Sequence, residues 1–387
     1  MKTVYPLLEN AFNSKDISLG ISVVKKKQLT MSKITKNFEK QFSKYVGSKY
    51  AVMVNSGSSA NLLSVFAAKS LYNLKNGDEV IVPSLCWSTS LWPIIQAGLK
   101  PVFVDINLKN YNASVDEILK KITKKTKIIL LIHVLGTSLN LDILKKKIKR
   151  KILIIEDTCE SLGTKYKNKY LGNFGEFGTY SFYYSHQITC GEGGMIVTNI
   201  KKNYEMLKIM RAHGWDRDIN KKNEKNFNFI NMGFNLRPLE ISAAIASNQL
   251  KRLKKFSKIR NENRGKIINA IRMHANWDNQ YYFVETEKYL KPSWFGLPLL
   301  LNKKYLPYKN SILKHLKNNG IETRPIISGN FLNQKAAKIY KLNSKKEKFP
   351  NADYVEKAGF FIGLHTYKIN NKMLKFLSNQ LLKIKID

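Results

Sequence analysis

The segment Thr-Tyr-Ser-Phe-Tyr-Tyr-Ser-His-Gln-Ile-Thr-Cys-Gly-Glu-Gly-Gly, residues 179–194, decides how the rest of the chain is interpreted. Its aromatic-rich start predicts a strand that ends in a tight turn, and its Gly-rich end leads into a second apolar strand, Met195–Thr198. His186 lies in the turn. An imidazole has an unperturbed pKa of about 6.5, so it can both take and give protons near neutrality. A lone turn histidine is more often structural, so the role of His186 depends on its surroundings.

Outward from this segment, short apolar runs alternate with longer amphipathic ones. The runs are β-branched and almost continuously apolar, which is typical of strands in a sheet covered on both faces. The predicted strands are 51–54, 79–82, 101–105, 127–134, 152–156, 179–182 and 195–198, and the helices between them include 58–74, 115–122 and 141–148. This alternation predicts an α/β fold with a mainly parallel sheet sandwiched by helices, which binds ligands at the carboxyl ends of its strands.

The pattern changes after Pro238. One helix is predicted over 239–253, and a basic helix follows it to about His274. Beyond them the sequence predicts strands near 281–284 and 293–299, a helix at about 308–318 and a strand-like segment over 321–327. We therefore expect two domains, a large ligand-binding domain over residues 1–245 and a smaller α+β domain over residues 246–387.

The charge of the chain is strongly positive. Its 66 lysines and arginines against 28 acidic residues give a formal net charge of +38, a balance that can indicate nucleic acid or an anionic membrane. The basic residues are spread along the whole chain with many Ile and Asn residues, as an AT-rich coding bias would produce, and no nucleic-acid motif accompanies them. We expect no nucleic-acid partner, although a positive surface attracts anionic substrates.

The cysteines and the apolar stretches bear on the compartment. Cys86, Cys159 and Cys190 are scattered, so they predict neither a disulfide framework nor a metal site and suit a reducing cytoplasm. Residues 1–6 lack the apolar run of a signal peptide. Residues 80–99 are uncharged over membrane length but contain two prolines, which favours a buried strand–loop–helix over a membrane span.

Three motifs follow predicted strands. Gly57 and Ser58 open a helix after the first strand, where free N–H groups suit a phosphate, although plain helix caps look the same. Asp157 follows the fifth strand and either points into the ligand crevice or caps a helix. Trp87 follows another strand and either stacks on a flat ring or belongs to the core. Because all three follow strands of the sheet that precedes His186, we expect them in one site.

These motifs give the chain a resemblance to the DegT-type sugar-nucleotide aminotransferases, which are pyridoxal-phosphate (PLP) enzymes of fold type I. The resemblance runs nearly end to end and is carried by residues 50–62, 87–89, 156–162, 185–186, 211–215, 233–240, 293–296, 324–331 and 351–354. Those aminotransferases hold PLP covalently on a lysine five residues before the GEGG, where this chain has His186. The chain is therefore more similar to the histidine-bearing branch, the sugar-nucleotide 3-dehydratases that serve the biosynthesis of colitose, a deoxysugar of lipopolysaccharide O-antigens.

The resemblance implies a role for each motif. PLP, or its amino form pyridoxamine phosphate (PMP), would be held non-covalently, with His186 as the base. The implied cofactor contacts are Gly57, Ser58 and Ser181 at the phosphate, Trp87 on the ring, Asp157 at the pyridine nitrogen and Glu160 beside the ring. Asn235 would reach the cofactor phosphate of the neighbouring subunit, which implies a homodimer with shared active sites. Arg217 and Arg237 would contact the phosphates or the carboxylate of the substrate.

The resemblance also implies a reaction in two halves. L-glutamate first converts PLP to PMP and leaves as 2-oxoglutarate. PMP then acts on the C4 ketone of a nucleotide-linked 4-keto-6-deoxy sugar, with GDP-4-keto-6-deoxy-D-mannose as the expected substrate. The C3 hydroxyl leaves, and the 3-deoxy ketosugar and ammonia are released. Because no lysine competes for the cofactor, elimination can win over transamination.

Two other functions stay open. A PLP-dependent sugar-nucleotide aminotransferase would leave nitrogen on the sugar, but it predicts a Schiff-base lysine, and Lys165, Lys167 and Lys169 lie outside the frame. A non-catalytic binding protein would explain the charge but not the combination of Asp157, Glu160 and His186. A related histidine-bearing branch binds an iron–sulfur cluster, which needs four closely spaced ligands that three scattered cysteines do not supply.

Overall fold

The computed structural model describes residues 3–8, 12–30, 32–219, 227–344 and 346–383. Met1 and Lys2, which begin the segment without a signal-like apolar run, lie outside these residues, as do residues 384–387 at the end of the second predicted domain. The elements that position the candidate site all lie within the described part.

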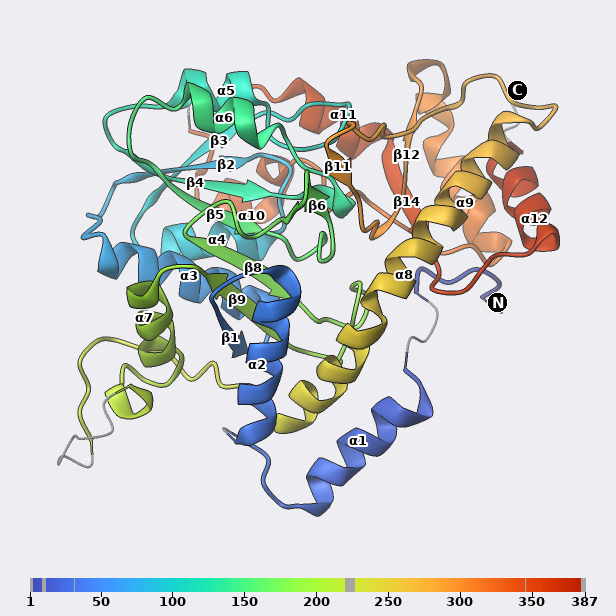
Figure 1. Cartoon of the computed structure of the whole chain (residues 1–387). Helices are drawn as coiled ribbons and strands as arrows, with labels where there is room; N and C mark the ends of the chain where they lie inside the picture. The colour runs from blue at the N-terminus through green and yellow to red at the C-terminus, as the bar shows by residue number, and fades with distance from the viewer. Residues whose placement is uncertain (1–2, 9–11, 31, 220–226, 345, 384–387) are drawn as a thin grey trace.

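A seven-stranded sheet forms the centre of the N-terminal part (Figure 1), in the order β1-β9-β8-β5-β4-β2-β3. Its strands are β1 (Tyr50–Val54), β2 (Glu79–Pro83), β3 (Lys100–Val104), β4 (Thr126–Ile132), β5 (Leu153–Asp157), β8 (Phe177–Ser181) and β9 (Gly194–Thr198). β9 runs antiparallel to both of its neighbours, and the other pairs are parallel. The seven predicted strands and the mainly parallel sheet are confirmed.

Helices cover both faces of this sheet, because alternate strand residues point to opposite sides. Ile128 and Leu130 of β4 belong to the same apolar core as Leu63 and Ile94, which come from the helices of one face. Ile129 and Leu131 pack instead with the helices of the other face. The helices of the first face include α3 (Gly57–Leu71) and α4 (Ser88–Gln96), and those of the second include α5 (Val115–Lys121) and α6 (Leu141–Lys147).

The longest helix is α8 (Glu240–Arg272), which crosses the molecule diagonally in Figure 1. The prediction of two successive helices was wrong, because the segment has no internal proline and its apolar contacts continue through Leu253, Phe256 and Ile267. The predicted domain boundary near residue 245 falls inside this continuous helix, and the division into two domains stays a prediction.

The C-terminal part is built on a four-stranded sheet in the order β10-β12-β14-β13. These strands are β10 (Tyr281–Tyr282), β12 (Gly296–Leu301), β13 (Thr323–Arg324) and β14 (Gly359–Gly363), and a small sheet consists of β6 (Lys165–Tyr166), β7 (Lys169–Tyr170) and β11 (Leu290–Lys291). The strand expected over 321–327 covers only two residues, and β14 was not predicted. The α+β character of this part follows the prediction.

The remaining helices complete the layers around the two sheets. They are α1 (Ser14–Lys25), α2 (Lys33–Val46), α7 (Lys201–Arg211), α9 (Lys309–Asn318), α10 (Lys335–Ile339), α11 (Pro350–Ala358) and α12 (Asn371–Leu381), with short 3-10 turns η1 (Val134–Gly136), η2 (Asp216–Asp218), η3 (Lys303–Tyr308) and η4 (Phe331–Asn333). Within the described residues, no helix is both long and apolar enough to cross a membrane.

Candidate active site

A cavity of about 1050 Å³ lies at the carboxyl ends of the central strands. Its volume is at the upper limit of ordinary small-molecule pockets, so it has room for a cofactor and a substrate together. The predicted site residues that line it are Gly57, Ser58, Trp87, Asp157, Glu160, Ser181 and His186. They come together because parallel strands present their carboxyl ends at the same edge of a sheet.

The N-terminus of α3 forms one end of the cavity. Ser56 caps the helix by accepting a hydrogen bond from the Ser59 N–H at 3.0 Å. A Cβ atom on Gly57 would lie 2.5 Å from Cβ of Ser181, so only glycine lets the helix start so close to β8. The first N–H groups of a helix have no partner within the helix, and here they stand beside the Ser58 and Ser181 hydroxyls. This cradle suits a phosphate.

Asp157 is the last residue of β5 and is buried at the floor of the cavity. Its Oδ2 accepts hydrogen bonds from Asn61 Nδ2 at 2.7 Å and from Ser90 Oγ at 2.8 Å, and its Oδ1 accepts one from the Cys159 N–H at 3.1 Å. Asp157 therefore ends a strand and caps no helix, which removes that alternative. Three donors fix the carboxylate, as a buried charge requires.

Glu160 lies beside Asp157 in the same wall. Its Oε2 accepts a hydrogen bond from the Leu135 N–H at 3.0 Å. Leu135 has a φ of 51°, an unusual backbone conformation for a non-glycine residue that directs its N–H at the carboxyl. Burial raises the pKa of Glu160 to about 7, and the nearby Asp157 charge acts in the same direction. Glu160 is therefore protonated in a large fraction of molecules at neutral pH.

His186 points one ring nitrogen at the main chain. Its Nδ1 lies 2.7 Å from the carbonyl oxygen of Cys159. A carbonyl oxygen only accepts hydrogen bonds, so Nδ1 carries the proton and Nε2 of the neutral ring keeps its lone pair. Burial lowers the pKa of His186 to about 4, which keeps the ring neutral at physiological pH. The geometry therefore presents Nε2 as a base.

Trp87 stands at the mouth of the cavity, just before α4. Its side chain is 57% exposed, so it does not belong to the core, which was the alternative interpretation. An exposed indole beside a cavity is available to cover a flat ring.

The other wall of the cavity comes from the C-terminal part, and its residues had no predicted site role, although segments 293–296 and 324–331 carry part of the resemblance. That wall includes Arg324, Lys335, Phe295, Phe331 and Phe361. Among the described residues that line the cavity, Lys335 is the one lysine, and it belongs to α10 and not to the β8–β9 turn. Asn61 and Ser90, which fix Asp157, were also missed, although both lie within a few residues of predicted site residues. A helical-wheel reading of 57–64 places Asn61 on the same face as Gly57 and is the signal that was available.

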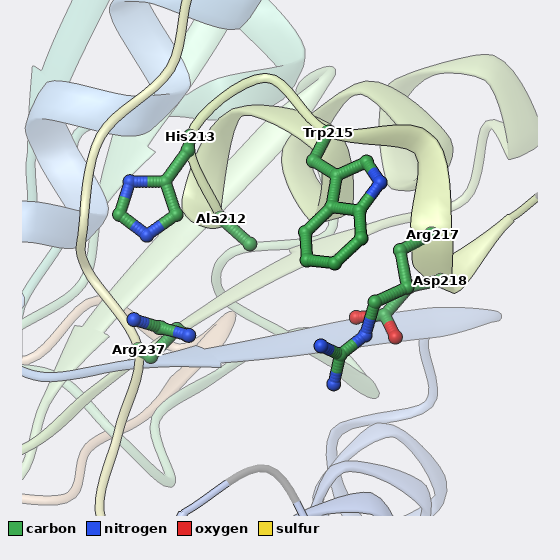
Figure 2. Close-up of a pocket in the computed structure, with 6 residues that line it drawn as sticks. All are labelled: Ala212, His213, Trp215, Arg217, Asp218 and Arg237. Carbon is green, nitrogen blue, oxygen red and sulfur yellow. The ribbon is translucent and has the colours of Figure 1, made fainter. Parts of the chain in front are cut away.

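Asn235, Arg217 and Arg237 do not line this cavity. Arg217 and Arg237 line a separate hollow of about 20 Å³ with Trp215 and three neighbours (Figure 2). Arg217 lies 4.9 Å from the Trp215 ring centroid, and Arg237 Nε donates a hydrogen bond to Asn235 Oδ1 at 3.0 Å. We call Arg217, Asn235 and Arg237 the arginine cluster. Its three members lie together, apart from the cavity of their own chain.

The sequence of the chain is similar to a known enzyme family and to two named relatives. The model of the DegT/DnrJ/EryC1/StrS aminotransferase family matches residues 12–372. The chain is 38% identical over 379 residues to GDP-4-keto-6-deoxy-D-mannose 3-dehydratase of Escherichia coli O55:H7, covering 94% of this chain and 96% of that protein. It is 37% identical to the Yersinia pseudotuberculosis protein of the same name, covering 98% of both.

A solved structure agrees with the sequence comparisons. The E. coli GDP-4-keto-6-deoxy-D-mannose-3-dehydratase with bound hydrated PLP superimposes with a TM-score of 0.91 at 36% identity, covering 98% of this chain and 100% of that one. The predicted fold type of the PLP enzymes is confirmed by this match.

Proposed function

The chain belongs to the DegT/DnrJ/EryC1/StrS aminotransferase family, and from this premise we propose that it is a PLP-dependent sugar-nucleotide 3-dehydratase. Its substrate is a nucleotide-linked 4-keto-6-deoxy sugar, GDP-4-keto-6-deoxy-D-mannose, and its amino donor is L-glutamate. The observation that carries the proposal is His186, a neutral base in the cavity where the aminotransferases of the family have a lysine.

The residues of the cavity fit PLP. The glycine-dependent cradle of α3 and Ser181 suits the phosphate, and the exposed Trp87 ring suits the face of the pyridine. The fixed carboxylate of Asp157 suits a protonated pyridine nitrogen. When bound, PLP supplies an electron sink and a carbon that exchanges an amino group between the two substrates.

The side chains of the cavity divide the proton chemistry between them. His186 accepts and returns protons at Nε2, because its Nδ1 is occupied by the Cys159 carbonyl. Glu160 holds a proton near neutral pH, so it donates a hydrogen bond where a glutamine of the aminotransferases would. The net reaction removes the C3 oxygen from the sugar and converts glutamate to 2-oxoglutarate and ammonia. Glutamate therefore supplies the two electrons that the deoxygenation consumes.

The arginine cluster serves a second copy of the chain in this proposal. Arg217 and Arg237 cannot contact a substrate in a cavity that they do not line, so we assign them, with Asn235, to the cavity of a partner subunit in a homodimer. Support comes from the apolar surface beside the cluster, where Phe227 is 67% exposed and Phe229, Ile230 and Met232 are exposed as well. The three free thiols suit the cytoplasm as the working compartment.

The test combines purified protein, PLP, L-glutamate and GDP-4-keto-6-deoxy-D-mannose. Mass spectrometry of the sugar nucleotide and an ammonia assay follow the reaction. We expect a product lighter by one oxygen together with released ammonia. A product that retains nitrogen would instead identify an aminotransferase, and protein that neither binds PLP nor changes the sugar would refute both enzymes.

A further inference from the structure

Arg260 of α8 is a buried cation that the proton chemistry described above does not use. Only 1% of the residue is exposed to solvent. Within the part of the chain that the structure describes, its guanidinium makes one long hydrogen bond, from Nη1 to the Trp294 carbonyl at 3.4 Å, and no ion pair, and its Nε has no partner. Burial lowers the pKa of Arg260 to about 10, so the side chain is still charged at neutral pH. Such a charge weakens the fold and acts on the titratable groups around it. Trp294 belongs to residues 292–296, which we call the strap.

One face of α8 holds the strap. The Ser257 and Ser293 hydroxyl oxygens are 2.6 Å apart. The Arg264 guanidinium lies over the Trp294 ring, 4.1 Å from its centroid. Ser257, Arg260 and Arg264 are spaced three and four residues apart, so they share a face of the helix. The strap is therefore tied to α8 by three successive side chains, of which Arg260 is the central one.

The other side of the strap contacts the turn that carries the base. The Phe295 and His186 ring centroids are 5.1 Å apart, with the rings edge to face. Gln187 Nε2 donates a hydrogen bond to the Ser293 carbonyl at 3.3 Å, and the Phe295 N–H donates one to the Leu135 carbonyl at 3.2 Å. The strap thus lies between α8 and His186 and fixes the place of the imidazole relative to the helix.

Two cations lie close enough to act on the His186 ring through their charge. Burial is the main cause that lowers the pKa of His186, and the charges of Arg260 and Arg324 add to it, whereas the Cys159 carbonyl and the Asp157 carboxylate oppose it. Arg324 lines the open cavity, where water and bound anions screen it, but Arg260 is sealed from solvent and keeps its effect in every state of the site. The other titratable side chains that line the cavity on this side are Glu160, Tyr183 and Glu192.

We propose that Arg260 is a positioning residue for His186, which ties the strap to α8 and places a permanent positive charge across the strap from the base. This inference rests on the proposed function, in which His186 moves the proton. A nearby cation disfavours a second proton on the imidazole, so Nε2 keeps its lone pair in acid as well as at neutral pH. For the same reason, a proton that Nε2 accepts during the reaction is readily given back.

The test separates the charge of Arg260 from its hydrogen bond. Arg260→Gln keeps a donor for the Trp294 carbonyl but loses the charge, Arg260→Met loses both, and Arg260→Lys keeps the charge. PLP-loaded protein with ¹⁵N-labelled histidine is titrated by NMR, and the His186 signal is assigned by its loss in His186→Asn. Both neutral variants should raise the pKa of His186, so that its protonated fraction at pH 5.5 increases by roughly 3- to 10-fold. Arg260→Lys should stay closer to wild type.

Lys254→Gln is the matched control, because it removes one positive charge from an exposed position of the same helix, where water screens it. It should leave the His186 titration unchanged. In turnover, the acid limb of kcat in Arg260→Gln should move to higher pH, with little change at pH 8. An unchanged His186 titration in both neutral variants would overturn the inference, even if their denaturation midpoints changed, and would leave the proposed function intact. Shifted titrations in protein whose wild type makes no 3-deoxy sugar would refute the proposed function alone.

Discussion

The cavity and the arginine cluster contrast in how their polar groups are satisfied. In the cavity, the Asp157 carboxylate, the Glu160 carboxyl and the His186 ring each have a partner within the chain. In the cluster, Arg217 lies on an indole ring and Arg237 donates one hydrogen bond to an exposed amide. The difference teaches that one chain fixes the three polar groups of its cavity by itself. Among the described residues, the two arginines of the cluster keep donors that make no hydrogen bond. In the proposed homodimer, substitutions in the cavity should act within one subunit, and those in the cluster should act on the partner's site.

The largest expected effect is at His186. Replacing it in His186→Asn should lower kcat by roughly 10²- to 10⁴-fold, because a positioned general base contributes about that much. PLP should still bind, since the cradle and Asp157 are untouched. The measurement is the rate of 3-deoxy sugar formation by mass spectrometry, with bound PLP read from its absorbance.

His274→Asn is the control, because His274 contacts Asn379 and does not line the cavity. A His186→Asn variant with wild-type kcat would show that another group is the base. The cavity of one chain would then not owe its base to His186, and the contrast with the cluster would no longer rest on this residue.

The next largest effect is a loss of stability at the N-terminus of α3, where Gly57 packs against Ser181. Gly57→Ala places a methyl group 2.5 Å from Cβ of Ser181, and such overpacking typically costs about 1–3 kcal/mol of the free energy of unfolding. Urea denaturation measures this cost. Gly265→Ala is the matched control, because a Cβ at Gly265 of α8 meets no neighbour within 4 Å.

Gly265→Ala should therefore stabilise the protein by about 0.5–1 kcal/mol, through helix propensity alone. The two substitutions should have opposite signs. Equal changes in the free energy of unfolding would mean that the close approach of α3 to β8 is not a constraint.

Glu160 predicts a smaller, pH-dependent effect. Its folded pKa is raised to about 7 from an ordinary value of 4.5, so the folded state holds the proton more tightly. The contribution to stability is present below pH 4.5 and is lost as pH rises through 7. Glu160→Gln does not titrate, so its free energy of unfolding should fall less than that of wild type between pH 4.5 and 8. We expect a difference of about 1–2 kcal/mol, discounted from the full shift because the carboxyl faces the open cavity.

Denaturant midpoints across that pH range provide the measurement. Glu285→Gln, at an exposed position, should follow the wild-type curve. If Glu160→Gln does so too, the carboxyl is not protonated at neutral pH and its donor role fails.

The smallest signal tests the cluster. His186→Asn and Arg237→Ala impair different regions, so each variant alone should have low activity. In a homodimer with shared sites, random mixing after co-refolding should restore about a quarter of wild-type activity, because half of the dimers then have one intact site. Mixing two cavity variants, His186→Asn and Asp157→Ala, is the control and should restore none. Absence of complementation with an inactive Arg237→Ala would show that the cluster does not serve the cavity of a partner subunit.

Much of the cavity could be predicted from sequence because of one geometric rule. Parallel strands share an edge, so Asp157 at the end of β5 lies in one site with Ser181 at the end of β8 and with His186 in the turn that follows. The wall with Arg324 could not be predicted in this way, since its place depends on long-range hydrogen bonds such as that from Ser328 to the Cys86 carbonyl. The continuity of α8 was missed because the change to a basic surface resembled a boundary, whereas its buried face continues without interruption.

The bond between His186 and the Cys159 carbonyl has a consequence for how this site tolerates mutation. Every amino acid carries that carbonyl, so the proton on Nδ1 is specified by an atom that no side-chain substitution at position 159 deletes. Substitutions of Cys159 therefore leave the tautomer of His186 unchanged, provided that the backbone at position 159 keeps the same conformation. The side chain that matters for this tautomer is instead that of Asp157. Its Oδ1 accepts a hydrogen bond from the Cys159 N–H and so holds the backbone at position 159 in place.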